Sequence, residues 1–190
     1  MVSKADSCRV DLAYTLGGDD RIEGLCPYWS RAARDRMGLR LDEDCVLGRP
    51  VWDFINGGAT LRLYDALIWH VRITGKRASF RYRGDCPGAI RYMRMTLTPG
   101  TGRRIHLRSE LLHDQPTARA VFFTHVGYRQ CPDLMQCSLC HKLEADGRWF
   151  TLSEALEHTT LIDELFPTEI GDTVCDSCRT KLELQLGVVL

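Results

Sequence analysis

The sequence lacks a long apolar run, an excess of charge of either sign and an apolar leader. No stretch approaches the roughly 18 consecutive apolar residues that a membrane helix needs, so we expect no membrane-spanning segment. Its 25 basic side chains (Lys and Arg) equal its 25 acidic ones, which argues against a uniformly basic nucleic-acid coat protein or an acidic tail. Because the N-terminus has no apolar core of a signal peptide, we expect a cytoplasmic protein.

The chain has 190 residues, of which 44% are hydrophobic and 26% charged. This composition is typical of a folded globular protein, and the length suits one ordinary domain with an appendage or two small domains. Nine cysteines are many for a cytoplasmic protein. An odd number of cysteines in a reducing compartment favours metal ligands and free thiols over a disulfide framework.

The first part of the chain alternates between helix and strand patterns. Apolar side chains recur at helical spacing over residues 60–74 and stop at Gly75, and residues 28–38 also contain helix formers. Three stretches with a period of two follow, and Pro99-Gly100-Thr101-Gly102 joins the last two as a hairpin. They are residues 77–83, 93–97 and 105–111. The patterns predict an α+β fold, with helices on one face of an antiparallel sheet.

The distribution of cysteines predicts the domain boundaries. We expect a first domain over residues 1–112, a linker over 113–136 and a small module over 137–190. In the module, Asp146-Gly147 indicates a turn before a short strand, and Thr151 with Glu154 forms a capping box that opens a short helix. A segment of this size buries little apolar surface and usually needs a cross-link, such as a structural metal, to stay folded.

Four cysteines near the C-terminus form two C-x2-C pairs, Cys137 with Cys140 and Cys175 with Cys178. Two intervening residues let both thiolates of a pair face one ion, and two pairs complete a tetrahedron. Four thiolates suit zinc, although iron would accept the same set. A closed four-cysteine site leaves no position for water, so we expect structural zinc, whose removal unfolds the module before the rest of the chain.

The remaining cysteines have no assigned role; they are Cys8, Cys26, Cys45, Cys86 and Cys131. Three of them precede proline, an arrangement in which a thiolate can ligate haem, so a haem site is an alternative that we do not favour. Cys131 lies six residues before Cys137. A thiol-redox switch between Cys131 and a metal-site cysteine is a further alternative.

Several segments of the first part resemble bacterial PAS-fold proteins. They are Asp20-Arg21-Ile22, Trp29, residues 46–55 (VLGRPVWDFI), the helix from Thr60, residues 83–87 (RGDCP) and residues 91–95 (RYMRM). The tail, CSLCHKLEADGRWFTLSEALEH running to VCDSC, is similar to the C-x2-C modules of bacterial signalling proteins. The resemblance implies a five-stranded antiparallel sheet against short helices, with a pocket between them. A zinc-ribbon-like module follows this domain in the chain.

Apolar side chains at the predicted sheet–helix interface are candidates for core or for the lining of a small-molecule pocket. They are Trp52, Phe54, Tyr64, Ile68, Phe80, Met93, Met95 and Leu107. Their identities do not select a ligand. The Asn-Cys-Arg-Phe motif of flavin-adduct photosensors is absent from the sequence, so we expect no flavin.

The neutral total conceals two unlike regions. Residues 62–108 contain eleven basic and two acidic side chains, whereas residues 137–190 contain four basic and ten acidic ones. Some of the arginines fall on the predicted solvent-exposed face of the sheet and form a candidate surface for an anionic partner. They are Arg77, Arg81, Arg83 and Arg94. The face could be solvated or attract the acidic tail, bind an acidic protein, or bind nucleic acid, which we do not favour.

Together these patterns predict a small regulatory protein, with a PAS-like sensor or protein-interaction domain and a structural zinc module. No set of residues has the pattern of a catalytic acid–base pair or nucleophile, so we expect no enzymatic activity. We expect a protein partner, which includes a second copy of the chain, and allow for a small-molecule ligand. The alternatives are a zinc-containing nucleic-acid-binding regulator that uses the arginines, and a thiol-redox or haem-linked sensor.

Overall fold

The structure is a computed structural model. It describes residues 12–27, 29, 43–86, 88–117, 121–127, 132–158, 160, 162 and 166–187. Within these ranges no helix has the length and apolar character needed to cross a membrane. Of the helix predicted over 28–38, only Trp29 lies within the described residues.

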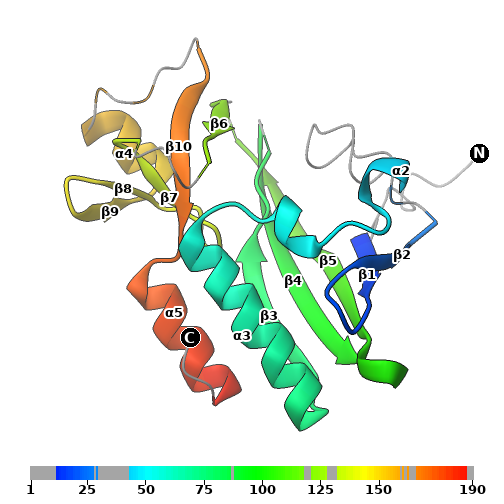
Figure 1. Cartoon of the computed structure of the whole chain (residues 1–190). Coiled ribbons are helices and arrows are strands. Elements are labelled where there is room, and N and C mark those ends of the chain that lie inside the picture. Colours follow the sequence, from blue (N-terminus) through cyan, green and yellow to red (C-terminus); the bar gives the residue numbers. More distant parts are fainter. Residues whose placement is uncertain are drawn as a thin grey trace, which may run out of the picture.

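A five-stranded antiparallel sheet dominates the first part of the chain (Figure 1). Its strands are β1 (Leu12–Leu16), β2 (Ile22–Leu25), β3 (Ala78–Arg83), β4 (Ala89–Pro99) and β5 (Ile105–Pro116). They are arranged in the order β2-β1-β5-β4-β3, so that β3 forms one edge of the sheet. The predicted α+β class with a five-stranded antiparallel sheet is confirmed, and all three stretches with a period of two lie in β3, β4 and β5 or directly beside them.

Helix α3 (Gly58–Thr74) covers one face of this sheet, as the apolar spacing predicts. Gly75 ends the helix in the left-handed conformation, with φ of 65°, and its amide donates to the carbonyl of Val71. Leu67 and Val71 on the helix pack with Phe80 and Leu107 of the sheet in one buried cluster. The short α2 (Glu43–Val46) and the 3-10 helix η1 (Val51–Phe54) precede α3.

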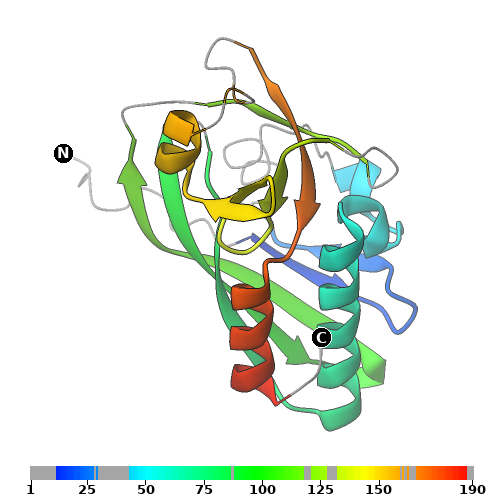
Figure 2. The ribbon, with the colours of Figure 1, turned by 90° about the vertical axis from the view of Figure 1, so that its left-hand side faces the viewer.

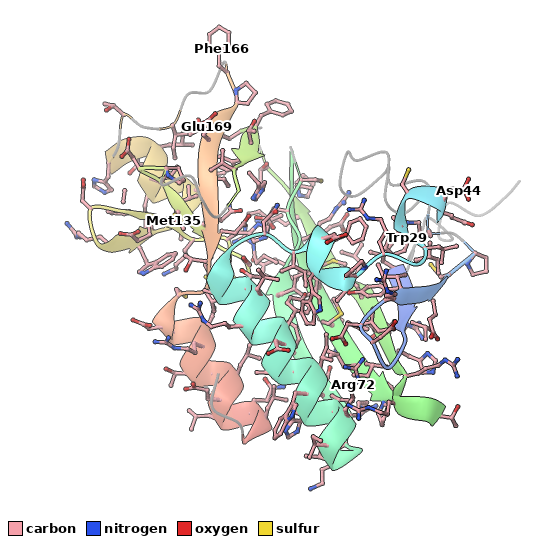
Figure 3. All side chains as sticks on the ribbon, viewed as in Figure 1. Trp29, Asp44, Arg72, Met135, Phe166 and Glu169 are labelled. Carbon is pink, nitrogen blue, oxygen red and sulfur yellow. The ribbon has the colours of Figure 1, made fainter. Side chains whose placement is uncertain are left out.

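Arg72 anchors α3 to the turn between β1 and β2 (Figure 3). Its guanidinium lies 2.6 Å from the carboxylate of Asp20 and also donates to the carbonyl of Gly17 at 2.7 Å and of Arg103 at 3.1 Å. The Arg72 side chain is only 9% exposed. Although Arg72 belongs to the basic stretch, its charge is therefore used in contacts within the domain.

The C-terminal part contains a second, smaller sheet of short strands in the order β6-β10-β7-β8-β9. The strands are β6 (Phe123–His125), β7 (Met135–Cys137), β8 (Leu143–Ala145), β9 (Arg148–Phe150) and β10 (Thr168–Thr173), with helices α4 (Leu152–His158) and α5 (Asp176–Leu186). The predicted turn at Asp146-Gly147 has positive φ at both residues. The amide of Thr151 donates to Glu154, and the amide of Glu154 donates to the Thr151 hydroxyl, as the capping box predicts.

The C-terminal module packs against the edge of the first sheet. Helix α5 lies beside α3 in both views (Figures 1 and 2), and the Gln185 side-chain amide donates to the β3 carbonyl of Ser79. Cys137, Cys175 and Leu182 belong to the same buried cluster as the sheet–helix core. Strand β5 continues through Pro116, so the segment predicted as a linker over 113–136 begins inside this strand.

Candidate metal centre

The first cysteine pair lies where β7 turns into β8. Cys137 is the last residue of β7, and its amide and carbonyl bond to the carbonyl of Lys142 and the amide of His141, both at 2.9 Å. His141 has φ of 57°, a left-handed conformation that lets the chain reverse directly after Cys140. This tight turn brings both thiols of the pair to the same side of the hairpin.

The second pair lies at the start of α5. Cys175 is the N-cap residue of the helix, and its carbonyl accepts hydrogen bonds from the amides of Cys178 and Arg179, both at 3.0 Å. Cys178 therefore lies in the first turn of α5. The N-terminal end of a helix favours negative charge, which suits the ligands of a cation.

The four sulfur atoms converge. The Sγ atoms of Cys137, Cys140, Cys175 and Cys178 all lie within 4.8 Å of one another, and those of Cys140 and Cys175 are 3.8 Å apart. A tetrahedron with metal–sulfur bonds of about 2.3 Å has edges of about 3.8 Å, so the arrangement fits one tetrahedral ion. Cys137 and Cys175 are buried, and the other two are half-buried. The cluster of cysteines that the spacing predicts is therefore present and can hold a metal.

Neighbouring hydrogen bonds already stabilise one thiolate of the four. Hydrogen bonds from the thiols of Cys140 and Cys178 lower the pKa of Cys137, and the amide of Cys175 adds a bond to the Cys137 sulfur at 3.4 Å. The same shared proton raises the pKa of Cys140 to about 11. The remaining thiols must lose protons to the solvent when a metal binds, so the affinity for a metal rises with pH.

The turn of the first cysteine pair is bonded to both layers of the first domain. The amide of Arg83 at the end of β3 donates to the carbonyl of Leu139 at 2.7 Å. The hydroxyl of Ser138 lies 2.7 Å from that of Thr60, a buried residue in the first turn of α3. The first bond occupies a backbone donor at the end of the edge strand β3, and the second ties the same turn to α3.

A polar cluster lies beside the metal centre. The Asp85 carboxylate accepts a hydrogen bond from Nε of Arg83 at 2.9 Å and lies 3.4 Å from Nδ1 of His141. Burial raises the pKa of Asp85, but the hydrogen bonds from His141 and Arg83 outweigh it and bring the pKa to about 2. His141 is thus bonded to Asp85 instead of joining the four sulfur ligands.

The other described cysteines do not belong to the cluster. Cys26 follows β2, Cys45 is exposed on α2, and Cys86 forms an isolated bridge with Ala89. Cys8 and Cys131 lie outside the described residues, so the redox alternative with Cys131 stays a prediction.

The candidate pocket residues pack in or around the sheet–helix core. Ile68, Phe80, Met93, Met95 and Leu107 are buried, and three others are half-buried and pack against the same cluster. Those three are Trp52, Phe54 and Tyr64. A ligand pocket among them stays a prediction.

The candidate arginines fall into two groups. Arg81 and Arg94 face each other across β3 and β4 on the outer side of the sheet, and Arg77 precedes β3. Arg83 instead bonds to Asp85 and lies over the ring of Tyr92. Tyr82 contributes to the core side, where its hydroxyl lies 2.5 Å from that of Ser109.

Two polar pairs were not predicted from the sequence. Thr60 pairs with Ser138, and His125 on β6 pairs with Asp172 on β10 at 2.9 Å. Both pairs join residues far apart in the chain, and no spacing signal in a single sequence indicates them.

No family model matches the chain, and no curated protein matches it. Two of the solved structures that are similar to it each match at 16% identity and cover 54% of this chain. One is a domain of an HTR-like protein from Haloarcula marismortui ATCC 43049, covered over 98% of its length with a TM-score of 0.39. The other is a PAS domain of an HTR-like protein from Haloarcula marismortui, covered over 82% with a TM-score of 0.35. At these TM-scores the fold class rests on the strand pairing described above.

Proposed function

We propose that this chain is a small regulatory protein in which a PAS-like domain acts as a sensor or protein-interaction unit and a structural zinc holds the C-terminal module against it. The convergence of the four cysteines at the edge of β3 is the observation that carries the proposal. The metal centre shares its buried cluster with the sheet and α3, so its occupancy is linked to the packing of the whole domain.

Zinc is the metal that four cysteine sulfurs at this spacing suit, and when bound it would supply a rigid tetrahedral cross-link. Cys137 and Cys140 would hold it from the hairpin, and Cys175 and Cys178 from the start of α5. A reducing cytoplasmic environment would keep these thiols available.

We propose no enzymatic activity. Four protein sulfurs around one ion leave no open position for a substrate or water. The nearby ionisable groups are bonded to one another, since Asp85 pairs with Arg83 and His141, and His125 pairs with Asp172. The chain would act through contacts, by shifting the balance between two arrangements of sheet and module.

Metal analysis combined with native mass spectrometry tests the proposal. The purified protein should carry one zinc per chain, and a metal-free protein of unchanged thermal stability would contradict the structural role. The same spectrum reports whether the chain forms a homodimer and whether it retains a small molecule.

A further inference from the structure

The outer face of the five-stranded sheet carries an ordered array of cationic side chains. Strand register places Glu110, Arg94 and Arg81 in one row across β5, β4 and β3. The next row contains Arg108 beside Thr96, and the row after it contains Thr15, His106 and Thr98. The helices α3 and α5 lie on the other side of the sheet or at its edge, so they do not cover these rows (Figures 1 and 2).

Like charges face each other in this array. Arg81 and Arg94 are directly opposite across an antiparallel pair, an arrangement that disfavours the sheet when no anion is near. Glu110 is the carboxylate that the structure places among them, 3.9 Å from Arg94 and 3.7 Å from Arg108. Among the described residues, Glu110 is the carboxylate that pairs with Arg94 and none pairs with Arg81, so the charge of these two arginines is compensated only in part. A further anion bound to this face would therefore reduce the repulsion between Arg81 and Arg94.

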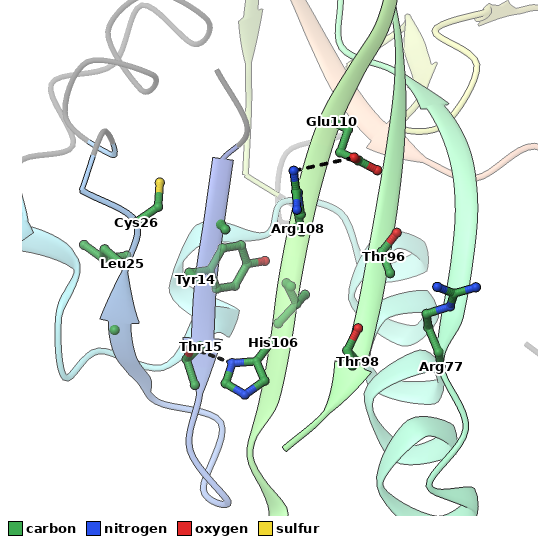
Figure 4. Close-up of a pocket in the computed structure, with 13 residues that line it drawn as sticks. Tyr14, Thr15, Leu25, Cys26, Arg77, Thr96, Thr98, His106, Arg108 and Glu110 are labelled. Carbon is green, nitrogen blue, oxygen red and sulfur yellow. Dashed lines mark hydrogen bonds and ion pairs between the residues drawn. The ribbon is translucent and has the colours of Figure 1, made fainter. Parts of the chain in front are cut away.

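The array borders a groove of about 660 Å³ that runs over β2, β1, β5 and β4 (Figure 4). Leu25 and Cys26 lie at one end of the groove and Arg77 at the other, with the hydroxyls of Thr96 and Thr98 between Arg77 and the side chains of β5. Hydroxyls and guanidinium groups donate hydrogen bonds, and carboxylates accept them. The groove thus combines an apolar end with a wide set of donors to anions.

The described part of the acidic tail does not lie on this face. It packs against the β3 edge and the α3 side, and the ion pairs of its carboxylates include those of Asp172 with His125 and of Asp176 with Arg179. Within the described residues, no ion pair joins the acidic tail to Arg81 or Arg94.

We propose that the row of Arg81 and Arg94 on the outer face, together with the groove that it borders, binds an acidic, extended segment of a partner protein. The inference rests on the proposed role as an interaction domain and names the chemistry of the partner. A flat sheet face about five strands wide accommodates an extended peptide of about eight residues. Carboxylates on alternate residues of that peptide face the arginine rows together.

The same features disfavour nucleic acid. Glu110 lies beside Arg94 and Arg108 and would repel a continuous phosphate backbone. Single-stranded nucleic acid is held largely by stacking of bases on exposed aromatic rings. Tyr92, an aromatic residue of the outer rows, is already stacked on His113 and contacts the guanidinium of Arg83.

Fluorescence anisotropy with the zinc-loaded full chain tests the inference. The probe is a labelled peptide of about eight residues, the length that spans the sheet, with glutamate alternating with serine. The comparison probes are the same peptide with glutamine in place of glutamate and a labelled single-stranded oligodeoxynucleotide. We expect binding of the glutamate peptide, weakening with salt, and no binding of the glutamine peptide.

The variants locate the site. The double substitution Arg81→Gln with Arg94→Gln should weaken binding of the glutamate peptide about tenfold, since two charge pairs are lost. The substitution Arg148→Gln, on an exposed arginine of β9, is the control and should leave affinity within about twofold, because it removes a positive charge away from the outer face. Glu110→Gln should tighten binding.

Three outcomes would overturn the inference: no binding of the glutamate peptide, equal loss in the double variant and the Arg148→Gln control, or tighter binding of the oligonucleotide than of the peptide. Zinc content and thermal stability are measured on the same samples. A failure of the peptide test with intact zinc and stability therefore leaves the structural zinc standing.

Discussion

The backbone amide of Arg83 donates to the carbonyl of Leu139 at 2.7 Å. Arg83 is the last residue of the edge strand β3, and Leu139 lies between the two cysteines of the first pair. The main chain of the metal centre thus adds a hydrogen bond at the outer edge of β3. This bond joins the C-terminal module directly to a sheet formed by residues far away in the chain.

We predict that loss of one cysteine of the cluster abolishes stable zinc binding. Cys140→Ser removes one of four sulfur ligands and should reduce the zinc content of the purified protein from one per chain to well below it. Cys45→Ser changes an exposed cysteine on α2 and should retain full zinc. Metal analysis of both variants makes the comparison, and equal zinc in the two would contradict the assignment of the ligands.

We predict that Thr60 and Ser138 are energetically coupled. Their hydroxyls are 2.7 Å apart at a part-buried site, so Thr60→Val or Ser138→Ala alone should cost about 1–2 kcal/mol by leaving a polar group without its partner. The double variant should cost less than the sum of the two single variants. Urea unfolding of all four proteins completes the cycle, and strict additivity would show that the bond contributes nothing.

We predict that Arg72 stabilises the domain. Arg72→Met leaves Asp20 and the carbonyl of Gly17 without their donor, at a site where the arginine side chain is almost fully buried. The free energy of unfolding should fall by about 3 kcal/mol. Arg62→Met, on the same helix, should change it by less than about 0.5 kcal/mol. Equal effects of the two substitutions would mean that helix propensity, and not the anchor, is responsible.

We predict that the His125–Asp172 pair stabilises the protein at low pH. The hydrogen bond to Asp172 raises the pKa of His125 above 6.5, so the folded protein binds this proton more tightly than the unfolded chain. The stabilisation is fully present below the unfolded pKa and is lost as the pH rises through the folded pKa. The difference in urea midpoint between wild type and His125→Asn should therefore shrink from pH 5.5 to pH 8.5, and an unchanged difference would exclude this role.

The sequence was sufficient to predict the elements whose signal is local. Helix α3 follows from apolar spacing that ends at Gly75, and β4 and β5 follow from alternation around a hairpin turn. The four cysteine ligands follow from spacing alone, because two residues between cysteines already restrict where the thiols can point. Each of these predictions depends on residues within a short window.

The strands β1, β2 and β10 were not predicted. They are short, and they are stabilised by pairing with residues distant in sequence, as when Tyr14 pairs with Leu107 and Gly171 with Met135. The junction between module and sheet is likewise non-local, since Arg83 and Leu139 are far apart in the chain. A single sequence carries no direct signal for such pairs, so the shared core of the two parts emerged only in three dimensions.

Hydrogen–deuterium exchange of the zinc-loaded and chelated protein tests the central claim most directly, that the metal centre holds the module against the edge of β3. We predict that chelation removes the protection of amides in α5 and of the Arg83 amide together, while amides shared between β1 and β5 stay protected. Unchanged protection of α5 and Arg83 after complete removal of the metal would contradict the account.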